Sequence, residues 1–173
     1  MSTEKDPFLG QGRLGDPRDV WGPKLWRALH VLADLSDRRD VSLLWQTVLK
    51  ATAEVLPCEK CRKHLQHYLR THTFMKVKSL HLVTGTQIRQ QIVKELHALH
   101  NDVNVRLGKP VFLPEQLTTY EQGTREQKLL EVKTILEELK TLWQPFLFRM
   151  PGHLVEWRKT LNLLIALLKG GPN

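Results

Sequence analysis

Cysteine is scarce in this sequence. Its 173 residues include two cysteines, Cys58 and Cys61, separated by three positions. One pair cannot supply the network of disulfides that holds small secreted domains together, so the fold must depend on other interactions. Because cysteine does not hold this fold together, we expect the Cys-x-x-Cys pair to have a chemical role.

The sequence also lacks a long apolar run. The longest, residues 163–168, is far too short to cross a bilayer. Residues 1–10 are polar and charged, with no apolar segment of the kind found in secretory signals. The sequence therefore predicts no membrane span and no export signal.

Acidic residues are outnumbered by basic ones, 18 against 26, which gives a formal net charge of +8. This balance indicates either an anionic ligand or an ordinary basic surface. Nucleic-acid binding would require basic residues interleaved with exposed aromatic ones, but the densest basic stretch, residues 60–78, contains only Tyr68 and Phe74. We therefore expect no nucleic-acid partner.

Strand signals are almost absent, since the one β-like piece, residues 111–113, is cut off by Pro114. Apolar residues recur at helical spacing almost throughout, which predicts an all-α protein. We expect a leader over residues 1–20, a helical domain over 21–123 and a helical hairpin over 124–173. The expected helices of the domain run from the region of Pro23 to about Asp34, from an Asp40 cap to Pro57, from Cys58 to about Thr71, and from roughly Thr86 to Leu107.

The last fifty residues predict two helices with facing apolar seams. Thr124 and Gln127 form a plausible capping box, and Pro145 and Pro151 are expected to break the chain between the helices. Such seams form an intramolecular core, a dimer interface or a surface for a partner. The seam residues are Val132, Leu136, Leu139, Trp143 and Phe146, then Leu154, Trp157, Leu161, Leu164 and Leu168.

The two cysteines lie at the predicted start of a helix. The positive end of the helix dipole, together with basic neighbours such as Lys60 and Arg62, favours thiolate over thiol. Their spacing allows a disulfide to close and reopen. Zinc is a weaker alternative: His64 and His67 continue the three-residue step, but the successive steps place His67 on the face opposite Cys58, so four ligands cannot converge. A thioredoxin-like fold would need flanking strands, so we expect no metal and no such fold.

A second group of polar residues follows one edge of the helix expected at 86–107. Leu96, Leu99, Val103 and Leu107 form its core stripe, and beside that stripe run His97, His100, Asn101 and Asn104. Amide and imidazole groups in a row suit a flat, heteroatom-rich ligand, although a polar seam between helices remains the alternative. Trp26 and His30, four residues apart, share a helix face and suit an aromatic ligand.

Three motifs in this order carry a resemblance to a known family. They are Trp21-Gly22-Pro23-x-x-Trp26-x-x-x-His30, Pro57-Cys58-x-x-Cys61-Arg62 and His100-Asn101-x-Val103-Asn104-x-x-Leu107-Gly108-Lys109-Pro110-x-Phe112. Together they closely resemble the Erv/ALR family of FAD-dependent sulfhydryl oxidases over roughly 100 residues. The resemblance implies a four-helix bundle with a short fifth helix, noncovalently bound FAD and a noncovalent homodimer.

The resemblance also implies roles for individual residues. Cys61 would lie next to the isoalloxazine ring, and Cys58 would meet the thiol of a dithiol protein substrate, with oxygen as the final acceptor. Lys109 would pair with the pyrophosphate, and Tyr120 could stack on adenine. The implied FAD contacts are Gly22, Pro23, Trp26, His30, His100, Asn101, Val103, Asn104, Leu107, Lys109 and Tyr120.

The sequence departs from the family pattern in lacking a shuttle cysteine pair and a disulfide that ties down the fifth helix. The substrate, of which a thioredoxin-like carrier is one candidate, must then reach Cys58 directly. Such reduced oxidases resemble those of large DNA viruses, which predicts the host cytoplasm and the virion, with the mitochondrial intermembrane space as the alternative. The hairpin enlarges a dimer interface, replaces the missing disulfide as a clamp, or recruits a partner. An inert interaction module that keeps the oxidase fold is the other functional possibility.

Overall fold

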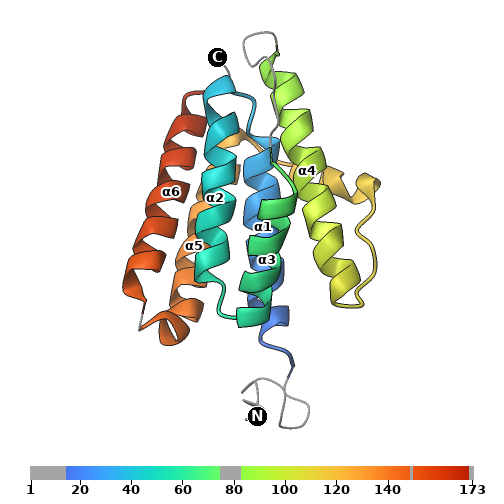
Figure 1. Ribbon diagram of the computed structural model, residues 1–173. Helices are drawn as coiled ribbons and strands as arrows, with labels where there is room; N and C mark the ends of the chain where they lie inside the picture. The colour runs from blue at the N-terminus through green and yellow to red at the C-terminus, as the bar shows by residue number, and fades with distance from the viewer. Residues whose placement is uncertain (1–14, 75–82, 149, 172–173) are drawn as a thin grey trace, which may run out of the picture.

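The computed structural model describes residues 15–74, 83–148 and 150–171. Within these ranges the chain is all-α, as predicted, and contains no strand. Figure 1 shows the helices running roughly along one common direction. The elements are α1 (Arg18–Asp34), η1 (Arg39–Val41), α2 (Ser42–Val55), α3 (Glu59–Thr71), α4 (Gly85–Arg106), η3 (Pro114–Tyr120), α5 (Arg125–Leu147) and α6 (Pro151–Lys169).

Helix α1 is the central element, because it packs against α4, η3 and α5. It ends at Asp34 as predicted, but it begins at Arg18, so Pro23 lies inside the helix and not near its first turn. Within α1, Leu25, Leu29 and Leu32 are buried at helical spacing, and these side chains join the core. Because Pro23 has no backbone N–H, the helix loses one hydrogen bond there, and burial of its apolar face offsets this loss.

Asp40 does not cap α2, which corrects the sequence prediction. The carboxylate instead accepts hydrogen bonds from the Arg38 guanidinium, at 2.9 Å from Nε and 2.6 Å from Nη2. Val41 occupies the N-cap position without a side-chain cap, and the short η1 turn leads directly into α2. The neighbouring arginine competes successfully for the carboxylate because a bidentate, charge-assisted pair is stronger than a single N-cap bond.

Helix α4 begins with a capping box, in which the Thr84 hydroxyl accepts from the Gln87 N–H at 3.2 Å. The next residue, Gly85, lies so close to the loop between α1 and η1 that a Cβ there would be 1.9 Å from the Asp37 carbonyl oxygen. Only glycine fits this contact, which joins the start of α4 to the end of α1. At the other end of α4, Gly108 turns the chain with a φ of 65°.

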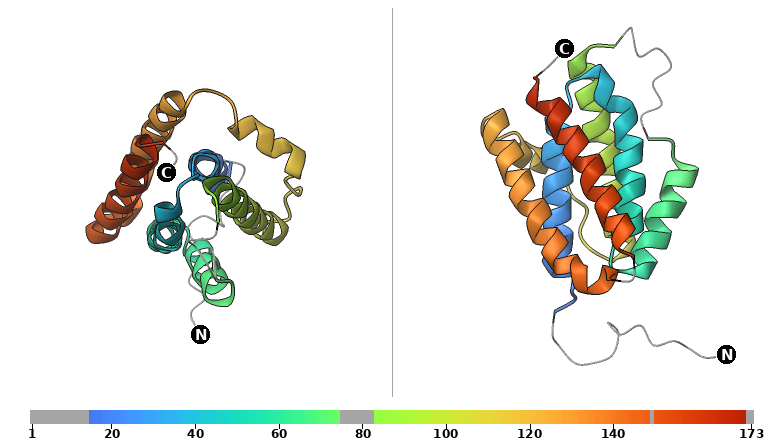
Figure 2. Two further views of the ribbon diagram at one scale, coloured as in Figure 1. Left: turned by 90° about the horizontal axis from the view of Figure 1, so that it is seen from above. Right: turned by 90° about the vertical axis from the view of Figure 1, so that its left-hand side faces the viewer.

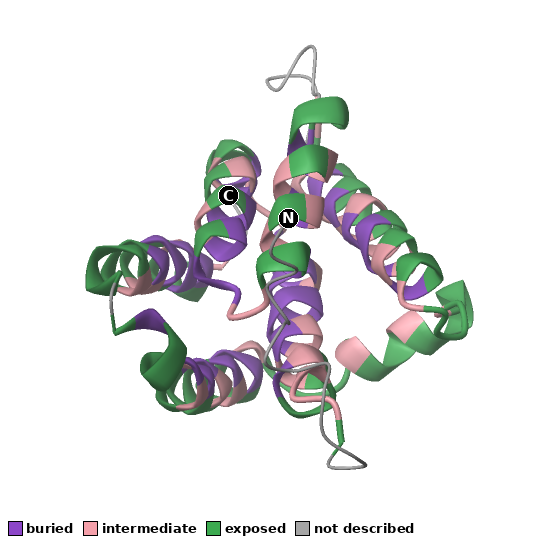
Figure 3. Ribbon diagram, turned by 60° about the horizontal axis from the view of Figure 1, so that its bottom comes forward, coloured by how far each residue is buried: buried purple, intermediate pink, exposed green. Residues whose placement is uncertain are grey.

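The hairpin of α5 and α6 packs along α1 and α2, respectively. Figure 2 (left) shows it on one side of these two helices, with α4 and η3 on the other. Trp143 and Trp157 are fully buried, and their ring centroids lie 5.0 Å apart. Figure 3 shows the buried residues of each long helix turned towards the interior. The other buried seam residues are Val132, Leu136, Leu139, Leu161, Leu164 and Leu168.

Two details of the hairpin differ from the sequence prediction. Helix α5 passes through Pro145 and ends at Leu147, so the chain breaks only before Pro151. Phe146, expected in the seam, is 44 % exposed. The Thr124 and Gln127 capping box at the start of α5 is confirmed.

Candidate functional site

Cys58 and Cys61 form a disulfide at the N-terminus of α3, as their spacing predicts. Their Cα atoms are 5.1 Å apart, within the range for this bond. Cys58 is the N-cap residue, and its sulfur accepts a hydrogen bond from the Cys61 N–H at 3.2 Å. The helix therefore begins at Glu59, and its unsatisfied N–H groups and positive dipole end face the sulfurs.

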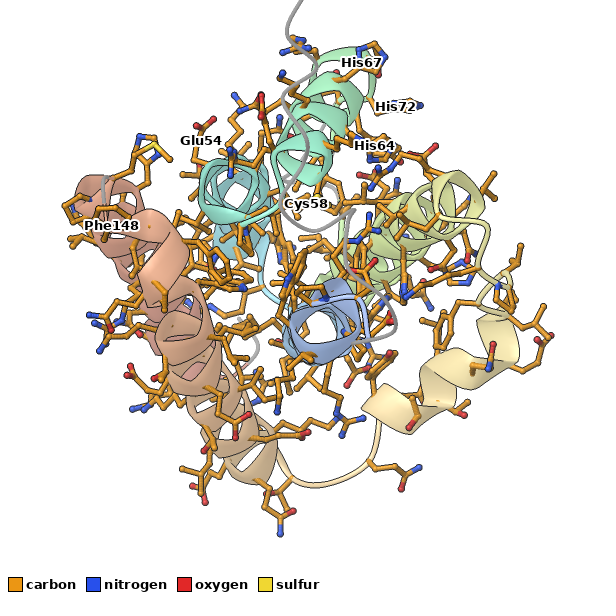
Figure 4. All side chains as sticks on the ribbon, turned by 90° about the horizontal axis from the view of Figure 1, so that it is seen from below. Glu54, Cys58, His64, His67, His72 and Phe148 are labelled. Carbon is orange, nitrogen blue, oxygen red and sulfur yellow. A yellow bond between two sulfur atoms is a disulfide. The ribbon has the colours of Figure 1, made fainter. Side chains whose placement is uncertain are left out.

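The two sulfurs have different surroundings. Cys58 is half-buried, whereas Cys61 is only 7 % exposed and belongs to the core. Figure 4 looks along the bundle from the end where α3 begins and shows Cys58 at that end. Cys58 is thus the more accessible of the two cysteines, while Cys61 belongs to the core.

Cys61 lies in the wall of a cavity of about 310 Å³. The walls come from α1, α2, α3 and α4, and Tyr120 of η3 closes one side. The lining is largely apolar and aromatic, a setting that suits a flat ring system. The lining residues are Arg18, Trp21, Gly22, Pro23, Leu25, Trp26, Leu29, Leu49, Thr52, Leu56, Cys61, His64, Leu65, Leu99, His100, Val103, Asn104, Arg106, Leu107, Lys109 and Tyr120.

Most of the residues expected to bind FAD lie in this wall. They are Gly22, Pro23, Trp26, His100, Val103, Asn104, Leu107, Lys109 and Tyr120. His30 and Asn101 lie outside the wall and contact residues behind it. The expected residues of α1 and α4 that line the cavity share one face of each helix, because lining residues on one helix recur at helical spacing. Their binding of FAD stays a prediction.

Stacked rings form one side of the cavity. The Trp26 indole lies on the His100 imidazole with centroids 4.0 Å apart and planes 10° apart. The Tyr120 ring stacks on His30 at 4.6 Å with planes 8° apart. His30 Nε2 and His100 Nδ1 share a hydrogen bond of 3.0 Å, which links the two stacks.

Burial holds both of these imidazoles in the neutral form. Desolvation, with a smaller contribution from the charge of His100, lowers the pKa of His30 to about 3. Desolvation followed by His97 lowers the pKa of His100 to about 4. The His30 Nδ1 atom is buried and has no hydrogen-bond partner among the described residues. The neutral His100 ring therefore gives the cavity wall a polar group that a heteroaromatic ligand can use, whereas His30 lies behind the wall.

Asn101 and His97 use their side chains on the protein itself. Asn101 Nδ2 donates to the Phe112 carbonyl at 2.9 Å, and the Phe112 N–H donates to Asn101 Oδ1 at 2.8 Å. His97 Nε2 also lies 2.7 Å from that carbonyl. The polar stripe of α4 thus divides into two parts. His100 and Asn104 line the cavity, whereas His97 and Asn101 hold the segment that leads to η3.

Sequence reasoning did not select several lining residues, and three of these, Arg18, His64 and Arg106, are cationic or titratable. Arg18 and Arg106 line the cavity together with Lys109. Burial, followed by the charge of Arg18, lowers the pKa of Arg106. Arg18 pairs with Asp16, and Lys109 Nζ lies 2.7 Å from Asp19 Oδ1. The closeness of two arginines from α1 and α4 was not visible in sequence, because it depends on how the helices pack.

His64 was considered as a zinc ligand but lies in the cavity wall, and its Nε2 is 2.8 Å from Asp102 Oδ2 on α4. Burial, followed by the charge of Arg106, lowers its pKa, and Asp102 opposes that shift. Figure 4 shows His67 further along α3, apart from Cys58. The described residues contain no group of three side chains that could hold a metal ion. None of the helices they form is long and apolar enough to cross a membrane.

A helical bundle with a redox-capable disulfide beside an aromatic cavity defines a class of thiol-handling proteins. The Erv1/Alr family model matches residues 23–123, more than half of the chain, and the protein belongs to this family. The match confirms the resemblance drawn from the three motifs. It ends just before α5, so the hairpin lies outside the matched segment.

Individual relatives are viral. The chain is 34% identical over 108 residues to a FAD-linked sulfhydryl oxidase of African swine fever virus (isolate Pig/Kenya/KEN-50/1950), which covers 60% of this chain and 82% of the relative. It is 27% identical over 105 residues to a protein of Invertebrate iridescent virus 6 named for the same activity, covering 59% and 90%. No solved structure matches the chain significantly.

Proposed function

We infer that this protein is a FAD-linked sulfhydryl oxidase that forms disulfides in protein substrates. The single observation that carries this inference is the position of the Cys58–Cys61 disulfide, with one sulfur accessible and the other in the wall of an aromatic cavity. Membership of the Erv1/Alr family and the names of the viral relatives support it.

The protein's own chemistry is thiol–disulfide exchange. A substrate thiolate attacks Cys58 Sγ, a mixed disulfide forms, and Cys61 leaves as a thiolate. The second substrate thiolate then attacks the substrate sulfur of the mixed disulfide and releases Cys58. The substrate has lost two electrons and two protons, and the cysteine pair has gained the two electrons. The N-terminus of α3 stabilises the thiolates formed in these steps.

The cavity residues fit FAD. Trp26 and His100 are aromatic residues of the wall, and His100 and Asn104 offer hydrogen bonds. Arg18, Arg106 and Lys109 offer cations to a diphosphate. Held by these residues, FAD would supply the two-electron acceptor for the cysteine pair and the route to oxygen that yields hydrogen peroxide. Cys61 is the flavin-side cysteine because it is the sulfur that lines the cavity, and Cys58 is the substrate-side cysteine because it is the more accessible one.

We further propose the finer assignments that the resemblance implies. The remaining expected contacts, His30 and Asn101, act from behind the wall, since His30 holds Tyr120 and His100 and Asn101 holds Phe112. The unit over residues 21–123 forms a noncovalent homodimer and oxidises a small carrier with a thioredoxin-like dithiol. The viral relatives support action in host cytoplasm.

Purified protein tests the proposal. We expect it to be yellow, with the visible absorption of bound flavin, and to consume oxygen and release hydrogen peroxide when a dithiol is added. Cys61→Ser and Cys58→Ser should each abolish turnover with a protein dithiol while retaining FAD. A colourless protein that cannot be reconstituted with FAD would instead identify an inert helical module with the oxidase fold.

A further inference from the structure

The short helix η3 contributes to the cavity although it has hardly any packing of its own. None of its residues, 114–120, is buried, and α1 is the main element it contacts. Figure 3 shows this segment in exposed and intermediate colours only, in contrast to the long helices. Yet Tyr120, its last residue, lines the cavity and stacks on His30. Apart from the partly buried Tyr120, which packs against the core, the segment must depend on directed contacts for its position.

Arg27 of α1 contacts η3 in two ways. Its Nη1 donates a hydrogen bond to the Thr119 carbonyl at 3.1 Å. Its guanidinium also lies over the Tyr120 ring, with Cζ 5.4 Å from the ring centroid, the arrangement of a cation–π contact. One side chain thus holds both the backbone and the ring at the end of η3.

Arg27 is itself held by the C-terminal hairpin. Its Nε donates to Glu131 Oε1 at 2.7 Å and its Nη2 to Glu131 Oε2 at 3.2 Å, which makes a bidentate pair with α5. Glu131, through these hydrogen bonds, raises the pKa of Arg27. The planar guanidinium therefore uses one edge for α5 and the remaining nitrogen for η3, a division that a lysine ammonium cannot reproduce.

We propose that the hairpin serves as a noncovalent clamp on the cofactor cavity, in which Glu131 orients Arg27 and Arg27 fixes Tyr120 against His30. This role rests on the proposed binding of FAD. It makes Glu131 and Arg27 positioning residues, since neither lines the cavity. The hairpin, although it lies outside the family match, thereby helps to shape the site.

The chain offers a matched control for this clamp. Lys24 and Glu138 also pair α1 with α5, about one turn from Arg27 on α1 and about two turns from Glu131 on α5. Their ion pair does not involve η3. A change at Glu138 removes an ion pair between the same two helices and leaves η3 alone. Arg27→Lys keeps a cation for Glu131 but loses the fork that reaches Thr119.

The test compares Glu131→Ala, Arg27→Lys and Glu138→Ala in the full chain. Hydrogen exchange of residues 113–121 is measured in the FAD-free protein, where the 3.0 Å bond from Gln116 N–H to the Leu113 carbonyl and the 3.2 Å bond from Glu121 N–H to the Thr118 carbonyl report an ordered η3. Affinity for added FAD is measured by quenching of flavin fluorescence.

We expect Glu131→Ala and Arg27→Lys to accelerate exchange in this segment and to weaken FAD binding by roughly three- to tenfold, while Glu138→Ala changes neither. Equal effects of Glu131→Ala and Glu138→Ala, or no change in exchange for Arg27→Lys, would overturn the clamp. The exchange experiment needs no FAD, so it can refute the clamp while the oxidase assignment stands. Failure of the wild-type chain to bind FAD would refute the assignment and the clamp's role towards a cofactor, while the exchange data would still decide whether Glu131 and Arg27 order η3.

Discussion

The two segments that follow α4 are held in opposite ways. The hairpin of α5 and α6 is fixed by apolar burial, with Trp143 and Trp157 fully inside the core. Helix η3 has no buried residue and depends on a few directed contacts from Arg27, Asn101 and His30. The better-packed segment therefore supplies stability, and the poorly packed one supplies part of the wall of the site.

The largest effect is expected where burial is greatest. Trp143→Ala removes a side chain that contacts both Trp157 and Trp21. We expect it to lower the free energy of unfolding by about 3–5 kcal/mol, because it leaves a large cavity in the core. Urea denaturation measures the change. Leu130→Ala, on the exposed side of the same helix at 67 % exposure, should change it by less than about 0.5 kcal/mol.

The next effect is the loss of stability in acid, which arises from the two buried imidazoles beside η3. Because the pKa of His30 is lowered to about 3 and that of His100 to about 4, the unfolded chain binds more protons than the folded one between these values and about 6.5. Stability is therefore greatest above this window and falls as pH is lowered through it. We expect a loss on the order of 2–4 kcal/mol between pH 7 and pH 4.

Urea titrations at successive pH values measure this loss. His30→Gln removes one of the two buried imidazoles, so its stability should depend less steeply on pH than that of the wild type. A wild-type curve that is flat over this range would show that these rings are not buried as described.

The attachment of Phe112 gives a smaller effect. Asn101→Ala deletes two hydrogen bonds to the Phe112 backbone, of 2.8 and 2.9 Å. We expect stability to fall by about 1–2 kcal/mol and hydrogen exchange to accelerate in residues 112–120, with α5 and α6 unchanged. The same substitution at exposed Asn162 serves as the control. Faster exchange spread evenly over the hairpin would contradict independent attachment of the two segments.

The smallest effect is expected at the Tyr120 hydroxyl. The contacts of Tyr120 with His30 and Arg27 use its ring, so Tyr120→Phe should change stability by less than about 0.5 kcal/mol and leave FAD affinity nearly unchanged. Tyr120→Leu removes the aromatic face and should weaken FAD binding. If the phenylalanine variant loses FAD as readily as the leucine variant, then the hydroxyl and not the ring is the important group.

Local features of the site were predictable from sequence. Cys58 caps α3 because a Pro-Cys pair before a helical pattern sets the start of the helix, and Thr124 caps α5 by its spacing to Gln127. Helical periodicity also placed His100 and Asn104 on one face of α4, and both line the cavity. These features depend on residues within a few positions of one another.

Features that depend on distant packing were not predictable. Asn101 belongs to the same stripe as His100, yet it binds Phe112, because the chain reverses at Gly108 and brings that backbone alongside α4. The pairing of Arg27 with Glu131 spans 104 positions, and no local pattern indicates it. Pro145 reads as a helix breaker, but the packing of Trp143 and Leu147 on either side of it keeps α5 helical.

The central claim is that electrons pass from the Cys58–Cys61 pair to a flavin in the adjoining cavity. Rapid mixing of oxygen-free, FAD-loaded protein with dithiothreitol, followed by visible absorbance, tests it most directly in the wild type and in Cys61→Ser. The account predicts prompt bleaching of the flavin in the wild type and little bleaching in Cys61→Ser, although that variant keeps its FAD. Bleaching of Cys61→Ser at the wild-type rate would contradict it.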